Sequence, residues 1–182
     1  MLHEILILLV STAAKLYTGI VLLRLYMQLA RVDFYNPIAQ FVIRVSDPPL
    51  KPLRRVVPGL WGIDCAALLL ALLLQFVAAA LLLSLKGVAA GAALYAVISV
   101  LGVLTLALDI AFFTLVATVV ISWVAPQSHH PAPLLLRQLG ELLLAPFRRL
   151  LPLTGGLDFS PMLALFVIHV LRSIVLPGLL GP

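Results

Sequence analysis

The stretch Lys51-Pro-Leu-Arg-Arg-Val-Val-Pro-Gly-Leu-Trp-Gly-Ile-Asp64 places two prolines and three cations among apolar residues. A variant stands near the other end of the chain, Ala145-Pro-Phe-Arg-Arg-Leu-Leu-Pro-Leu-Thr-Gly-Gly-Leu-Asp158. We call these stretches the first and the second basic segment. They align at a fixed offset of 94 residues, the separation of Arg54 from Arg148 and of Asp64 from Asp158.

The same offset pairs residues far outside the basic segments. The pairs are Pro52 with Pro146, Arg55 with Arg149, Pro58 with Pro152, Gly62 with Gly156, Asn36-Pro37 with His130-Pro131, Asp47 with Glu141, Gln75 with His169, and Lys15 with Asp109. So many matches at one offset indicate an internal duplication, and we predict two repeats, residues 1–93 and 94–182.

The composition is that of a membrane protein. Hydrophobic residues make up 63% of the 182 residues, charged residues only 10%, and the mean hydropathy is +1.19. Soluble domains are usually about 45–50% apolar. Four apolar runs are long enough to span a bilayer: 5–29, 66–85, one within 88–124, and one from Met162 to about Leu180.

The pattern therefore predicts an all-α integral membrane protein with four transmembrane helices. Each repeat contains two spans and a long connection, so the chain returns to its starting side and the two helical hairpins are parallel. The third run is too long for a simple span. Its repeat partner trims it to 99–123, and we expect 88–98 to form a separate short apolar piece.

The cations indicate an orientation. Of the twelve, eight lie in the connections after the first and third spans: Arg31, Arg44, Lys51, Arg54, Arg55, Arg137, Arg148 and Arg149. Clustered cations beside spans mark the cytoplasmic side. We expect both long connections to be cytoplasmic and both termini outside, in a bacterial inner membrane. The net charge of +5 is attributed to topology and lipid contacts, not to nucleic acid.

The sequence between the first and the second apolar run predicts two amphipathic segments that lie in the headgroup plane. Ile38, Phe41, Val42 and Val45 recur at helical spacing, and the prolines after Asp47 should end that helix. A second piece, 53–57, should begin behind Pro52.

Asp64 and Asp158 precede the second and fourth apolar runs. An aspartate there can cap the free amides of a helix start. The alternative is that both carboxylates pair with the neighbouring arginines in one polar cluster that binds anionic lipid or a partner. The candidate binding residues are Asn36, Pro37, Lys51, Pro52, Arg54, Arg55, Gly62, Asp64, Pro146, Arg148, Arg149, Gly156 and Asp158.

Ionisable residues inside the apolar runs form a second candidate site, because charges in hydrocarbon are costly. Lys15, Asp109 and Arg172 each lie about 14 residues from the predicted cytoplasmic end of a span. We expect Asp109 to pair with Lys15, with Arg172 as a competitor and His169 on the same face as Arg172. The alternative is that the cations reach the outer interface. A second polar stripe on the first run contains Tyr17, Arg24, Gln28 and Arg31, opposite Lys15.

No motif for enzyme chemistry occurs in the chain. Hydrolase, metalloprotease, redox and phosphate-loop patterns are absent. Adjacent His129 and His130 in a proline-flanked loop are expected to face solvent, and the lone Cys65 cannot form an intramolecular disulfide. We therefore predict a protein that is not an enzyme, with no cofactor and no metal site.

Three segments of the first half carry a family resemblance: Asp33-Phe-Tyr-Asn36-Pro37, Asp47-Pro-Pro-Leu-Lys51-Pro52-Leu-Arg54-Arg55 and Pro58-Gly-Leu-Trp-Gly62-Ile-Asp64. They resemble the YggT family of small bacterial and plastid membrane proteins, whose duplicated arrangement is similar over nearly the whole chain. The second half departs at His130, which replaces the asparagine, and at Ala145, which replaces the lysine.

The resemblance implies one of two functions. Members linked to division-site organisation or to cytochrome b6f assembly imply a scaffold or assembly factor that binds membrane lipids or other membrane proteins. Members associated with osmotic stress and potassium homeostasis imply a small channel, a transporter or its regulator. We favour the scaffold, and self-association stays open.

Overall fold

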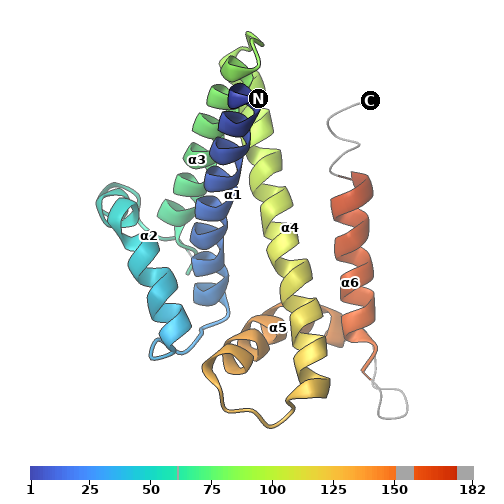
Figure 1. Ribbon diagram of the computed structural model, residues 1–182. Coiled ribbons are helices and arrows are strands. Elements are labelled where there is room, and N and C mark those ends of the chain that lie inside the picture. Colours follow the sequence, from blue (N-terminus) through green and yellow to red (C-terminus); the bar gives the residue numbers. More distant parts are fainter. Residues whose placement is uncertain (61, 151–157, 176–182) are drawn as a thin grey trace. The chain divides into compact units, whose positions relative to one another are not determined.

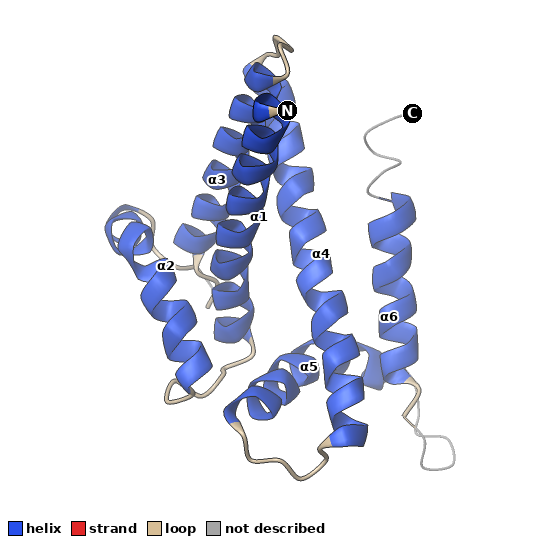
Figure 2. Ribbon diagram, in the orientation of Figure 1, coloured by secondary structure: helices blue, strands red, loops and turns tan. Residues whose placement is uncertain are grey.

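The computed structural model describes residues 1–60, 62–150 and 158–175, and every regular element within these ranges is helical (Figure 1, Figure 2). The elements are α1 (Leu2–Leu29), α2 (Pro37–Val56), α3 (Cys65–Leu85), α4 (Ala92–Val124), α5 (Pro131–Leu150), α6 (Ser160–Val170) and the π-helical turn η1 (Leu171–Val175). The predicted all-α class is confirmed for these residues.

Three of the helices, α1, α3 and α4, are long and apolar enough to cross a membrane. They contain 28, 21 and 33 residues, and about 20 are needed to span the hydrocarbon. The fourth predicted span is described only as the shorter apolar stretch Ser160–Ile174, because residues 176–182 lie outside the described residues. The count of four spans therefore stays a prediction.

The expectation of a separate apolar piece over 88–98 is wrong from Ala92 onward. α4 runs without interruption from Ala92 to Val124, so residues 92–98 are its first two turns. The Gly91 carbonyl accepts from the Leu94 amide, and no proline or glycine follows until Gly102. Nothing in the sequence ends the helix there, and the repeat alignment alone could not supply a break.

The helices group into two compact units: residues 1–25 with 42–107, and residues 26–41 with 108–182. In the first unit, α1 lies beside α3 (Figure 1), and α3 presents alanines to its neighbours. The buried alanines are Ala66, Ala67, Ala71, Ala78 and Ala79. Small side chains let helix backbones approach closely in a membrane, where packing replaces the hydrophobic effect.

The core of the second unit joins three helices. Ala111 and Leu115 come from α4, Leu144 from α5, and Ala164 and Ile168 from α6. Figure 1 shows α6 alongside α4, with α5 at one end of both. α5 therefore packs its buried face against the helices on either side of it in the sequence.

The prediction that the prolines divide the first connection into two pieces is wrong. α2 is one helix of 20 residues that contains Pro48, Pro49 and Pro52. Pro49 has no amide proton to donate to the Val45 carbonyl, and the Tyr17 hydroxyl of α1 donates to that carbonyl instead, at 3.2 Å. Part of the cost of the prolines is thus offset by a neighbouring helix, which local sequence rules do not consider.

The polar stripe of α1 contacts α2 and explains why the two helices pack together. Arg24, only 8% exposed, lies with Nη1 2.8 Å from the Ser46 hydroxyl and 3.2 Å from the Ile43 carbonyl of α2. At the equivalent positions in the second half stand Thr118 of α4 and Gly140 of α5. The Thr118 hydroxyl donates to the Leu136 carbonyl of α5 at 3.0 Å. The same helix faces therefore meet in both repeats, with an arginine and a serine in one and a threonine and a glycine in the other.

Replacing Gly140 by alanine should destabilise the protein. The added Cβ would lie 2.8 Å from the stiff, β-branched side chain of Thr118. We expect Gly140→Ala to lower the free energy of unfolding by about 1–3 kcal/mol, measured by denaturation in detergent. Gly19→Ala is the matched control, because a Cβ there meets nothing within 4 Å. An equal loss in the Thr118→Ala background would contradict the proposed clash.

Candidate functional site

The first basic segment forms an ion pair that also involves a helix cap. Asp64 is the N-cap of α3, and its Oδ1 accepts from the Ala67 amide at 3.2 Å. Its Oδ2 accepts from Arg54 at the end of α2, with Nε at 3.0 Å and Nη2 also in contact. Asp64 is only 6% exposed, so the two oxygens serve different partners within a shielded site. Asp64 therefore caps α3 and pairs with Arg54 at the same time, whereas a single polar cluster of both segments stays a prediction.

The turn before Asp64 depends on glycine. Gly62 has φ of 81°, in the left-handed region that glycine adopts without a steric penalty. Leu60 and Ile63 exchange two backbone hydrogen bonds of 3.1 and 2.9 Å around it. This tight turn brings Asp64 back to Arg54, ten residues earlier.

The second basic segment forms a similar pair with a shifted cap. Arg148 Nε donates to Asp158 Oδ2 at 3.0 Å. α6 starts at Ser160 with Phe159 as its N-cap, so the expectation that Asp158 itself is the N-cap is wrong by one residue. Asp158 Oδ1 still accepts from the Ser160 amide at 2.9 Å and satisfies one free donor of the helix start. Gly156, the predicted equivalent of Gly62, lies outside the described residues.

The two halves differ in how the carboxylate one turn before each basic segment is held. Asp47 lies 2.6 Å from Arg24 and 3.2 Å from Lys51. Thr118 and Ala145 replace these two cations in the second half, and the Asp47 equivalent, Glu141, pairs with Arg148 instead. Arg148 therefore joins two carboxylates, whereas Arg54 pairs with Asp64 alone among the described carboxylates.

These pairs are reflected in the protonation equilibria of the carboxylates. Hydrogen bonds from the Ser160 side chain and amide, together with Arg148, outweigh partial burial and lower the pKa of Asp158. Burial has the largest single effect on the pKa of Asp47 and raises it, but Arg24 and Lys51 together reverse that change and lower it. Glu141, followed by Asp158, raises the pKa of Arg148. These groups are therefore charged at neutral pH.

The remaining candidate residues of the basic segments are at the surface. Pro52 lies inside α2 and Pro146 inside α5, and both are exposed. Arg55 and Arg149 are also exposed, and neither forms an ion pair within the described part of the chain. Each segment thus uses one arginine for an internal pair and presents the next one to its surroundings.

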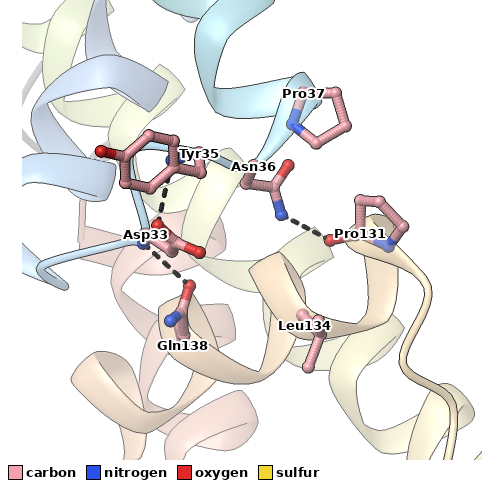
Figure 3. A pocket seen from close by; sticks show the side chains of 7 residues that line it. All are labelled: Asp33, Tyr35, Asn36, Pro37, Pro131, Leu134 and Gln138. Carbon is pink, nitrogen blue, oxygen red and sulfur yellow. Dashed lines mark hydrogen bonds between the residues drawn. The ribbon is translucent and has the colours of Figure 1, made fainter.

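Asn36 and Pro37 have structural roles that the sequence analysis missed. Asn36 Oδ1 accepts from the Ile38 and Ala39 amides at 2.9 and 3.4 Å, so Asn36 is the N-cap of α2 and Pro37 its first residue. Asn36 Nδ2 donates to the Pro131 carbonyl at 2.7 Å, where α5 begins (Figure 3). The Asn-Pro pair is a recognisable helix-start signal that could have predicted the cap but not the second contact.

A cavity of about 230 Å³ adjoins this contact (Figure 3). Its lining comes from the connection before α2, from the first residue of α2 and from the first half of α5: Asp33, Tyr35, Asn36, Pro37, Pro131, Leu134 and Gln138. At the position of Asn36 the second half has His130, whose Nδ1 accepts from the Ala132 amide at 3.4 Å. His130 therefore supplies a weaker cap than Asn36 does. The histidine that stands in place of the asparagine changes the hydrogen bonding at the start of α5.

The second candidate site, among the apolar helices, contains an ion pair. Asp109 of α4 pairs with the Arg172 guanidinium in η1. The guanidinium carbon also lies 5.6 and 5.9 Å from the ring centres of Phe112 and Phe113. His169, one turn earlier, lies beside Phe112, with ring centres 6.5 Å apart. Aromatic faces stabilise a cation that has left water.

Arg172 is thus the observed partner of Asp109, the residue that the sequence treated as a competitor. It lies in the π-helical turn η1, a feature that the sequence did not predict. Lys15 is exposed on α1, in the other compact unit, and its pairing with Asp109 stays a prediction.

Removing the Asp109 charge should destabilise α6 against α4. We expect Asp109→Asn to cost about 1–3 kcal/mol of unfolding free energy, because Arg172 loses its anion. The exchanged pair Asp109→Arg with Arg172→Asp should recover part of this loss. Lys15→Met is the control and should change the melting temperature little. A large loss with Lys15→Met but none with Arg172→Met would instead identify Lys15 as the partner.

Comparison with known proteins gives the chain's relatives. The family model described as CCB3/YggT matches twice, over residues 3–85 and 97–179, and both limits of the second match are displaced by 94 residues from those of the first. That displacement equals the offset between the two basic segments. No solved structure matches the chain.

Curated relatives cover nearly its whole length. An uncharacterized protein of Pseudomonas aeruginosa is 44% identical over 93% of this chain and 87% of the relative. The uncharacterized protein YggT of Escherichia coli K12 is 40% identical over 94% of this chain and 95% of the relative. An uncharacterized protein of Haemophilus influenzae is 37% identical over 94% and 91%. The chain belongs to the CCB3/YggT family.

Proposed function

We propose that this protein is a non-enzymatic scaffold of the bacterial inner membrane that holds lipids or partner proteins through α2 and α5. In this proposal four helices span the membrane as two parallel hairpins. Both connections that contain the basic segments are cytoplasmic, and both termini are outside. The bacterial origin of the relatives and the three long apolar helices support the location.

The two arginines of each basic segment have different surroundings, and this observation carries the proposal. Arg54 and Arg148 bind the carboxylate that precedes the next apolar helix, so they fix the end of α2 or α5. Arg55 and Arg149 are exposed next to them. The second arginine has no ion-pair partner among the described residues, so beyond marking the cytoplasmic side it can bind a lipid or a partner. An exposed cation next to a helix end that is held in place is suited to recruitment.

The alternative, a small channel or transporter, has less support from the described residues. Of the carboxylates in the long apolar helices, Glu4 lies in the first turn of α1 and Asp109 lies in the interior of α4, where its charge is already compensated by Arg172. A carboxylate that serves an ion pathway must exchange its partner for the transported ion. The exposed arginines have no evident role in such a pathway.

Site-specific photocrosslinking in living cells tests the scaffold. A photoreactive amino acid at position 55 or 149 should give adducts of discrete mass, identified by mass spectrometry as lipid or protein. Position 86, an exposed lysine at the end of α3, is the matched control and should give none. The absence of adducts at 55 and 149, combined with solute flux in liposomes that Asp109→Asn abolishes, would overturn the scaffold in favour of the transporter.

A further inference from the structure

The exposed side of α2 carries a row of three cations. Arg44, Lys51 and Arg55 are exposed and are separated by seven and four residues, so they lie on one face of the helix. The row spans about 16 Å at 1.5 Å per residue. The buried residues of the helix recur on a different face: Ala39, Val42, Ser46 and Leu50. The cations therefore point away from the protein core.

Little of this positive charge is neutralised within the chain. Asp47 is the acidic residue of α2, and Arg24, with a side chain only 10% exposed, lies closest to it. Lys51, whose side chain is 71% exposed, lies 3.2 Å from the other carboxylate oxygen of Asp47. Arg44 and Arg55 form no ion pair among residues 1–60, 62–150 and 158–175. The row therefore has an excess of positive charge that is available to anions from outside the chain.

An apolar strip flanks the cations. Phe41 is 61% exposed and Val56 is 81% exposed, while Ile38 and Val45 are partly buried. These residues lie between the buried face and the cationic row on the helical wheel. A helix with adjacent apolar and basic strips lies in the headgroup plane, with its apolar residues at the acyl boundary. An acidic protein surface could bind the cations without the exposed phenylalanine. The apolar strip therefore favours lipid as the binding partner of this face.

The connections of α2 keep it near the membrane in the proposed topology. α2 follows α1 and precedes α3, and both are long and apolar enough to span. Arg24 and Tyr17 hold its middle against α1, and Arg54 holds its end to the start of α3. The nearest anionic surface to the cationic row is then the headgroup layer of the same bilayer.

α5 lacks the equivalent row. The positions that match Arg44, Lys51 and Arg55 hold Gln138, Ala145 and Arg149. One cation remains of three. The duplication has therefore retained the helix in both halves while only the first copy has the charge needed to collect anions.

From this arrangement we infer that the Arg44, Lys51 and Arg55 face of α2 binds the headgroups of anionic phospholipids, and that α5 does not. This inference rests on the proposed function, because it assigns the lipid contact to one of the two proposed recruiting helices. Cations beside an anionic leaflet each contribute about 1 kcal/mol, which is roughly a fivefold preference per cation.

Lipid selectivity of the reconstituted full-length protein tests the inference. Spin-labelled phosphatidylglycerol and phosphatidylcholine are compared in vesicles at low salt, by the fraction of each immobilised at the protein. Arg44→Gln with Arg55→Gln should reduce the preference for phosphatidylglycerol by roughly fivefold for each cation removed. Lys86→Gln, which removes one exposed charge elsewhere, is the matched control for Arg44→Gln alone and should leave the preference intact. If the double variant of α2 does not fold, Arg44→Gln alone should reduce the preference for phosphatidylglycerol by roughly fivefold.

The outcomes separate this inference from the proposed function. An equal lipid preference in Arg44→Gln and Lys86→Gln, with no loss in the double variant of α2, would overturn the inference. If photocrosslinking from position 55 then gives a protein adduct, the scaffold stands and α2 binds an acidic protein surface. If position 55 and position 149 give no adduct, both the inference and the scaffold fail. A preference that disappears in about 1 M salt, where charges are screened beyond about 3 Å, would further support headgroup binding.

Discussion

The structure depends on Asp64, a single shielded carboxylate that must satisfy two groups at once. One oxygen accepts from an amide at the free start of α3, and the other accepts from Arg54 at the end of α2. A helix start and an arginine are both positive, so one anion placed between them stabilises both. The turn at Gly62 makes this geometry reachable, and it explains why glycine and aspartate stand together in the sequence.

In the second basic segment an aspartate also joins an arginine to the start of a helix, but the residues around it differ. Asp158 still joins Arg148 to the start of α6, although the cap is shifted by one residue. Where Arg24 and Lys51 are lost, Glu141 pairs with Arg148, and Gly140 makes room for Thr118. Duplication thus preserved the contact that defines the fold and left the surrounding charges free to change. The exposed cations of α2 are the part that the second copy lacks.

The sequence predicted the elements where the signal is local. The ends of the first two spans, the all-helical class and the capping role of Asp64 were recognisable from composition and spacing, whereas the separate ion pair within each basic segment was not predicted in that form. The continuity of α2 was missed, because the Tyr17 hydroxyl that replaces a lost proline donor comes from another helix. The contact of Asn36 with Pro131 and the turn that aims Arg172 at Asp109 were missed for the same reason. Contacts between distant segments are fixed by packing, which no local pattern records.

The double role of Asp64 is tested most directly by a double-mutant cycle on the free energy of unfolding. Asn keeps the capping acceptor but loses the charge, so Asp64→Asn, Arg54→Gln and their combination should all cost nearly the same. Asp64→Ala in the Arg54→Gln background should cost about 1 kcal/mol more, the value of the cap alone. If the costs of Asp64→Asn and Arg54→Gln simply add, or if Asp64→Ala costs nothing further, the carboxylate does not join the two helices as described.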